Sequence, residues 1–229
     1  MSAEKWMVAN NIIAFKVFSA SDASILPKGW KKPTAFTFDG VVFFDGVNIV
    51  VFSDKAQKFK IKNVPTKHHE MMELQTWLDS VKDSTLIGYG SAKFDSKILV
   101  KNHTVSGVHV DLAEMVYDAS EKHYGTHGRR YDIRQLAELN DYSQDAVSHL
   151  SLIKKPIALM GEWRRGLAKN VLKTLAAEVQ LIGQLYCQVI VHEELRIIDE
   201  RTERPVFMSF ANARNAEMYE KESKDVEEE

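Results

Sequence analysis

Side chains capable of metal or nucleophilic chemistry are sparse in this sequence. The eight histidines show no zinc-ligand spacing; one pair, His123 and His127, is four residues apart, but nearby glycines favour a loop and no acidic signature accompanies it. The single cysteine, Cys187, excludes a disulfide framework and any cysteine-built zinc site, and fits a reducing compartment. Neither a phosphate-binding Gly-x-x-x-x-Gly-Lys loop nor a nucleophile elbow is present. The remaining candidates are carboxylates and basic residues.

Basic side chains gather at three places in the sequence. The clusters are Lys28, Lys31 and Lys32; Arg129, Arg130 and Arg134; and Arg164 and Arg165. Such residues contact the phosphates of nucleic acids, although a solvated surface gives the same pattern. We take Arg129, Arg130, Arg164 and Arg165 as candidate nucleic-acid contacts.

The formal charge of −2 conceals an acidic end. The last 13 residues, EMYEKESKDVEEE, carry seven acids and two lysines. The rest of the chain is therefore left with about +3, which is only mildly basic. This balance does not require a nucleic-acid partner, and it slightly favours a protein partner.

The overall composition is that of a globular protein. Of 229 residues, 45% are hydrophobic and 27% are charged. We expect one domain over residues 1–210, followed by an acidic, solvated tail over 211–229. No apolar run approaches the roughly 20 residues that span a bilayer, and the start, MSAEKWMVANN, lacks the apolar core of a secretory signal. We therefore expect an intracellular protein, cytoplasmic or nuclear, with no membrane partner.

The first half of the chain has the pattern of β-strands. Asn11–Ala20 is an apolar run typical of a central strand, and residues 34–54 hold two β-rich runs separated by Asp45-Gly46, a strong hairpin signal. A third run, Lys58–Ile61, is a candidate to extend this sheet. Two short strands are expected further on, at Leu86–Tyr89 and Val108–Val110.

Helical periodicity dominates the rest. The expected helices are His68–Val81, Lys93–Lys101, Asp111–Tyr124, Ile133–Asn140, Val147–Leu150 and Leu167–Val191. Strands in a meander followed by alternating helices and strands indicate an α/β fold with a central mixed sheet flanked by helices.

Three segments, in order and spacing, resemble the RNase H-like 3'-5' exonucleases whose active site holds three aspartates and one glutamate. LIGYGSAKFDSKIL (Leu86–Leu99) resembles the second motif. VDLAEMVYDASEKHYGTHGRRYDIRQLAELN resembles the Asp-Leu helix and the Gly-x-Arg-x-x-Leu stretch, and GEWRRGLAKNVLKTLAAEVQLIGQLY (Gly161–Tyr186) the third-motif helix. The resemblance covers about residues 11 to 210, and is strongest to the branch that is similar to polymerase proofreading domains and is found alone or attached to helicases. It implies the RNase H-like fold.

The resemblance also implies a two-metal mechanism. These enzymes hold two Mg²⁺ or Mn²⁺ ions about 4 Å apart through several carboxylates. The first motif, Asp-x-Glu, supplies ligands to both ions. In this sequence Lys16 stands at the aspartate position and Phe18 at the glutamate position. An ammonium at a cation site repels metal ions, so we expect this substitution to abolish two-metal chemistry.

The other motif positions are partly kept. Asp95 matches the second-motif aspartate, and Glu178 stands at the third-motif aspartate. Thr174 replaces the tyrosine that orients water, and Asp111 matches a position expected to be structural. Each has an ordinary alternative: Asp95 suits a helix N-terminus, and Glu178 suits a solvated face or an ion pair with Lys16.

These comparisons imply a catalytically impaired exonuclease-like protein. It would need no cofactor, and would serve as a nucleic-acid- or protein-binding module in nucleic-acid metabolism, beside a helicase or polymerase for example. One alternative is an active Mg²⁺- or Mn²⁺-dependent exonuclease that uses Asp95, Glu178 and a displaced acid such as Asp22 or Asp39. Another is a purely structural subunit of a replication, repair or RNA-processing complex. If the alignment holds, Asp95 and Glu178 should approach each other beside Lys16.

Overall fold

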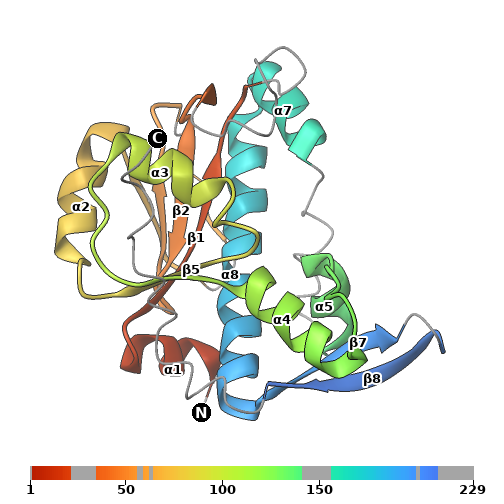
Figure 1. Cartoon of the computed structure of the whole chain (residues 1–229). Helices are drawn as coiled ribbons and strands as arrows, with labels where there is room; N and C mark the ends of the chain where they lie inside the picture. The colour runs from red at the N-terminus through yellow and green to blue at the C-terminus, as the bar shows by residue number, and fades with distance from the viewer. Residues whose placement is uncertain are drawn as a thin grey trace, which may run out of the picture.

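A six-stranded mixed sheet forms the centre of the protein (Figure 1). The computed structural model describes residues 2–21, 35–55, 59–61, 64–140, 156–199 and 202–210. The strand order is β4-β3-β2-β1-β5-β6. The strands are β1 Ile12–Phe18, β2 Gly40–Phe44, β3 Ile49–Phe52, β4 Thr66–His69, β5 Thr85–Gly88 and β6 His109–Asp111. The predicted α/β class with a mixed sheet is confirmed.

The predicted hairpin is present between β2 and β3. These strands pair antiparallel, with Phe44 opposite Ile49. The Asp45 carboxylate closes the turn by accepting hydrogen bonds from the backbone N–H groups of Val47 at 2.8 Å and Asn48 at 2.6 Å. Gly46 has a φ of +88°, a conformation that side chains other than glycine disfavour. Local turn chemistry thus explains why this part was predictable.

The region after the hairpin differs from the prediction. Of the expected extension Lys58–Ile61, the described residues 59–61 add no strand to the sheet, since Ile61 forms only an isolated bridge to Val64, and Lys58 lies outside the described residues. The strand at this edge is β4, which runs parallel to β3 and whose last two residues, His68 and His69, fall in the expected helix His68–Val81. Helix begins only with the short 3₁₀ turn Met71–Glu73 and continues as α2, Leu74–Ser80. Pairing with the free edge of β3 outweighs helical periodicity at His68 and His69.

Helices cover both faces of the sheet (Figure 1). One face packs against the long helix α8, and the other against α2 and α3. The remaining bounds are α1 Ala3–Ala9, α3 Asp95–Asn102, α4 Leu112–Tyr124, α5 Ile133–Leu139, α7 Pro156–Arg164 and α8 Ala168–His192. Sequence periodicity predicted α3, α4, α5 and α8 to within a few residues, but not α1 or α7. The expected helix Val147–Leu150 lies outside the described residues.

The central strand β1 divides its side chains between the two faces. Ile13, Phe15 and Val17 lie in the cluster under α2 and α3. Ile12, Ala14 and Phe18 lie in the cluster under α8. Because side chains alternate along a strand, Lys16 shares the α8 face with Phe18. A lysine is thereby placed in the middle of an otherwise apolar surface.

A separate two-stranded sheet follows α8. It pairs β7, Glu194–Asp199, antiparallel to β8, Arg204–Ser209. The Asn140 side chain holds the outer edge of β7: Arg196 N–H donates to Oδ1 at 2.8 Å, and Nδ2 donates to the Arg196 carbonyl at 3.0 Å. The hairpin is therefore fixed to the end of α5.

Helix α8 is long and apolar enough to cross a membrane by length and composition alone. In this fold, 67% of its most apolar stretch is buried against other elements. Core helices of soluble proteins meet the same criteria, so this feature is weak evidence for a membrane span.

Candidate functional site

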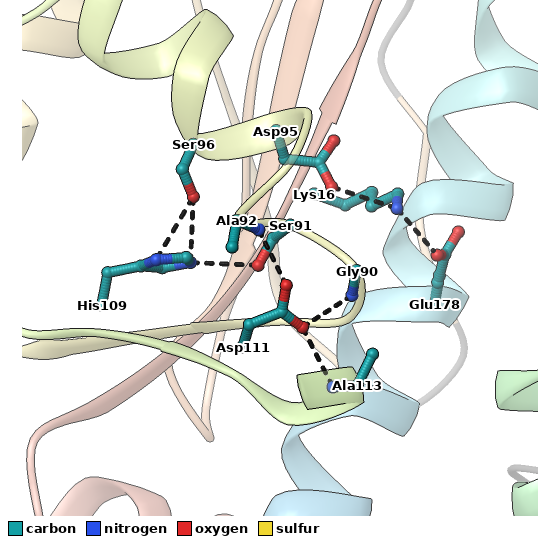
Figure 2. Close-up of polar contacts among 10 residues, drawn as sticks. All are labelled: Lys16, Gly90, Ser91, Ala92, Asp95, Ser96, His109, Asp111, Ala113 and Glu178. Atoms are coloured by element: carbon teal, nitrogen blue, oxygen red, sulfur yellow. Dashed lines mark hydrogen bonds and ion pairs between the residues drawn. The ribbon is translucent and has the colours of Figure 1, made fainter. Parts of the chain in front are cut away.

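The ammonium of Lys16 lies between two carboxylates. Its Nζ is 3.1 Å from Asp95 Oδ2 and 3.4 Å from Glu178 Oε1, as Figure 2 shows. The Asp95 side chain is 1% exposed and the Glu178 side chain 12%, whereas Lys16 keeps 22%. The prediction that Asp95 and Glu178 approach each other beside Lys16 is confirmed. We call these three residues the ion cluster.

Three distant segments converge to form the ion cluster. Strands β1 and β5 are parallel neighbours, with Ala14 opposite Ile87. The connection that follows β5 therefore lies at the carboxyl end of both strands, and it delivers Asp95 as the first residue of α3. Glu178 comes from the middle of α8, which crosses the same face of β1.

The electrostatics of the cluster hold Lys16 in its charged form. Burial alone would lower the pKa of Lys16, but Asp95 and Glu178 together raise it above its usual value. Burial raises the pKa of Asp95 to about 6, and the nearby ammonium only partly offsets this effect. Protonated Lys16 has no free electron pair, so it cannot act as a base or nucleophile. It neutralises charge instead.

Asp111 organises the loop that carries Asp95. Its Oδ1 accepts hydrogen bonds from the N–H groups of Gly90 at 2.8 Å and Ala113 at 3.0 Å, and its Oδ2 from Ala92 N–H at 2.8 Å (Figure 2). The carboxylate thus caps α4 and fixes the loop after β5. This agrees with the structural position expected for Asp111.

A histidine and two serines brace the other side of the same loop. His109 Nε2 lies 3.0 Å from both Ser91 Oγ and Ser96 Oγ (Figure 2). Burial lowers the pKa of His109, against the opposing effect of Asp111, so the ring is neutral at physiological pH. Sequence reasoning missed this group, because residues 91, 96 and 109 form no motif in the linear sequence.

Phe18 occupies an apolar contact. It is 5% exposed, and its ring centroid lies 4.8 Å from that of Trp163 in α7. Trp163 is itself buried, with Lys55 Nζ 5.3 Å from its ring centroid. The position aligned with a metal-binding glutamate therefore belongs to the hydrophobic core.

Thr174 is also a buried residue of α8. Its hydroxyl donates to the carbonyl of Asn170 at 3.0 Å, one turn earlier in the helix. A threonine hydroxyl cannot reach as far as the tyrosine hydroxyl that the resemblance implies at this position.

The four candidate nucleic-acid contacts lie on two different parts of the molecule. Arg164 and Arg165 stand at the end of α7, and Arg129 and Arg130 in the connection from α4 to α5; Figure 1 places these segments apart along α8. Arg129 stacks over Tyr124 at 4.9 Å, and Arg164 Nη2 lies 3.4 Å from the Ala20 carbonyl. They do not form one patch.

Arg134 interacts electrostatically with one member of the ion cluster. Asp132 chiefly, and Glu178 to a smaller extent, raise the pKa of Arg134. Its guanidinium donates twice to the Asp132 carboxylate, each time at 3.1 Å. Arg134 therefore adds positive charge within electrostatic reach of Glu178.

The displaced acids considered as alternative ligands are not in the ion cluster as far as the structure describes them. Asp39 Oδ2 accepts a hydrogen bond from Ala20 N–H at 2.8 Å and another from the Thr37 hydroxyl. Asp22 lies outside the described residues. Within the described part of the chain, no group of three or more histidine, cysteine, aspartate or glutamate side chains is placed to hold a metal ion.

Comparison of the sequence with protein-family models and with curated proteins gave no match. Any function must therefore be argued from the fold and the ion cluster.

Proposed function

We propose that this protein is a catalytically impaired relative of the RNase H-like 3'-5' exonucleases and acts as a binding module in nucleic-acid metabolism. The observation that carries the proposal is the position of the Lys16 ammonium, within 3.4 Å of both Asp95 and Glu178. Two residues aligned with metal-binding acids from separate motifs meet at one point, and a lysine lies between them. This is the arrangement expected if a fixed positive charge has replaced a bound ion.

The chemistry of the cluster argues against two-metal hydrolysis. Such hydrolysis needs two divalent ions, each held by several oxygen ligands. The cluster offers two carboxylates, both already facing an ammonium that stays protonated at neutral pH. A divalent ion entering there would be repelled by Lys16. The buried Phe18 cannot supply the missing oxygen ligands.

The ion cluster also accounts for a fold that persists without bound metal ions and remains usable for binding. The ion pairs satisfy charges that would otherwise be buried without compensation, which is costly. Loss of metals therefore leaves the sheet and α8 joined at this point. In this proposal the partner is a nucleic acid or a protein of a replication, repair or RNA-processing assembly, such as a helicase or polymerase.

The test combines nuclease and metal-binding assays on the full chain. We expect no shortening of single- or double-stranded DNA or RNA with Mg²⁺ or Mn²⁺, and no tight divalent site by calorimetric titration. Metal-dependent shortening that disappears in Asp95→Asn would instead establish an active exonuclease with an atypical ligand set. Pull-down tests the binding role, with immobilised DNA or RNA and with a helicase–polymerase extract. The amount bound by the wild-type protein is compared with that bound by Lys16→Met.

A further inference from the structure

A serine hydroxyl and an imidazole lie within hydrogen-bond distance of each other at the surface of the protein. Ser96 Oγ is 3.0 Å from Nε2 and 3.4 Å from Nδ1 of His109. Part of each residue is open to solvent, so a small molecule can reach both. Figure 2 shows Ser96 pointing toward His109, whereas Asp95, its neighbour in sequence, points toward Lys16. The pair therefore lies outside the ion cluster.

The imidazole of His109 is in the form that accepts a proton. The lowered pKa of His109 leaves the ring neutral at physiological pH. Its Nε2 faces the hydroxyls of Ser91 and Ser96, and either hydroxyl can donate a hydrogen bond to it. A neutral imidazole that accepts a hydrogen bond from a serine hydroxyl is the arrangement in which histidine acts as a general base.

Neighbouring groups hold this imidazole and favour its protonation. The side chain of Ser91 is fully buried, and its Oγ lies 3.0 Å from His109 Nε2. The ring of Phe15 in β1 meets the imidazole edge to face, with centroids 5.5 Å apart. The carboxylate of Asp111 favours the charged form of the ring. It would therefore stabilise the imidazolium that forms when His109 takes a proton.

A backbone N–H beside Ser96 can stabilise developing negative charge. Ser96 is the second residue of the eight-residue helix α3, whose N-cap residue Phe94 supplies no side-chain cap. The Ser96 N–H donates to the Ser91 carbonyl at 2.9 Å, but the Lys97 N–H meets no acceptor within the described residues. The N–H that follows a serine nucleophile is a common donor to an oxyanion. Nucleophile, base and oxyanion donor are the parts of an acyl-transfer site.

We propose that Ser96 accepts an acyl group from activated esters, with His109 as its general base and the Lys97 N–H as oxyanion donor. Ser96 Oγ attacks the carbonyl carbon of the ester and passes its proton to His109 Nε2. The bond from the carbonyl carbon to the leaving oxygen then breaks, and the leaving group takes the proton from His109. The product is an ester on Ser96 and a free alcohol or phenol. The inference goes beyond the proposed function and does not depend on it, because no step uses Lys16 or Glu178.

Reaction of the full chain with p-nitrophenyl acetate, followed by peptide mass spectrometry, tests the site. The internal reference is Ser80, an exposed serine whose hydroxyl donates to the Trp77 carbonyl at 2.6 Å rather than to an imidazole. We expect the acetyl ester to form at Ser96 about 100-fold faster than at Ser80, since a general base typically contributes a factor of this order.

His109→Gln keeps a polar side chain but removes the base. It should slow acetylation of Ser96 about 100-fold and leave that of Ser80 unchanged. Equal rates at the two serines of the wild-type protein would overturn the proposal. So would a folded His109→Gln variant in which Ser96 reacts as fast as before.

The pH dependence in the wild-type protein gives a test that needs no variant. Acetylation of Ser96 should become faster as His109 loses its proton and should level off near neutral pH, because the pKa of His109 lies below its ordinary value. Asp111 is the charged group that acts on this titration, while the contacting side chains of Phe15, Ser91 and Ser96 are uncharged. A rate that keeps increasing far into the alkaline range would show a serine that reacts without His109, and would contradict the proposal.

Discussion

The ring of Phe18 packs against that of Trp163 with centroids 4.8 Å apart and planes inclined by 49°. Both side chains are at most 5% exposed. The contact joins the end of β1 to α7, a helix that periodicity did not predict. It therefore links a strand of the sheet to a segment more than 140 positions later in the sequence.

Phe18→Glu should destabilise the protein strongly. The change removes a buried aromatic ring, which typically costs about 3–5 kcal/mol in Phe→Ala substitutions, and it buries a carboxylate. The free energy of unfolding in urea measures the effect. Phe18→Leu is the control and should cost clearly less than Phe18→Glu, since it loses part of the ring volume but keeps the site apolar. Equal stability of wild type and Phe18→Glu would show that position 18 is not held in the core.

Lys16→Asp should create a divalent-ion site while leaving the Phe18 contact intact. Three carboxylates would then meet without a counter-charge, and their mutual repulsion is relieved by a bound cation. We expect the midpoint of thermal unfolding to fall without metal and to rise by several degrees with Mn²⁺. Lys16→Met keeps the length of the side chain but adds no metal ligand. Its unfolding midpoint should also fall, but Mn²⁺ should raise that midpoint less than it does in Lys16→Asp. The same midpoint for Lys16→Asp with and without Mn²⁺ would contradict the idea that Lys16 stands at a former ion position.

Stability should depend on pH through Asp95. Its pKa is raised from 3.8 to about 6 in the folded protein, so the folded state binds this proton more tightly than the unfolded state does. Ionisation of Asp95 therefore lowers the free energy of unfolding as pH rises from about 4 to 7. We expect the difference in the free energy of unfolding, wild type minus Asp95→Asn, to fall by up to about 3 kcal/mol over this range.

Urea unfolding of both proteins at several pH values measures this difference, and the subtraction removes the contribution of other titrating groups. Lys16 stays protonated throughout, since its pKa is raised. A difference that increases with pH would mean that ion pairing outweighs burial at Asp95 and lowers its pKa.

Asp111→Ala should loosen the loop after β5. It removes a carboxylate that accepts three backbone hydrogen bonds, including the cap of α4. We expect a loss of about 2–4 kcal/mol, since a cap alone is worth about 1 and hydrogen bonds to charged groups about 1.5–3. Hydrogen exchange should become faster at Gly90 and Ala92. Asp132→Ala, which removes the cap of the short α5, is the control and should leave exchange at these two amides unchanged.

Sequence reasoning succeeded where local chemistry decides structure. The Asp45-Gly46 turn, the apolar run of β1 and the broad apolar face of α8 each determine their element within a short window. It failed for β4, because a strand of sequence TKHH depends on pairing with β3 rather than on its own pattern. The Asn140 clamp on β7 was not predictable either, since it joins residues 56 positions apart.

The same distinction applies to the candidate site. Alignment to motifs predicted that Lys16, Asp95 and Glu178 would meet, because each motif carries a fixed place in the expected fold. It did not predict that Phe18 would stack on Trp163, or that His109 would bind Ser91 and Ser96. Those contacts depend on packing between elements, for which the linear sequence holds no spacing signal.

The separation of Lys16 from Glu178 along the chain has a consequence for synthesis on the ribosome. Strand β1 is among the first segments made, yet the helix that covers Ile12, Ala14 and Phe18 is completed more than 170 residues later. Until α8 emerges, this apolar face lacks its main cover and the Lys16 ammonium lacks its contact with Glu178. Nascent chains shorter than about residue 190 therefore present an incomplete core, the kind of surface on which chaperones act and from which aggregation starts.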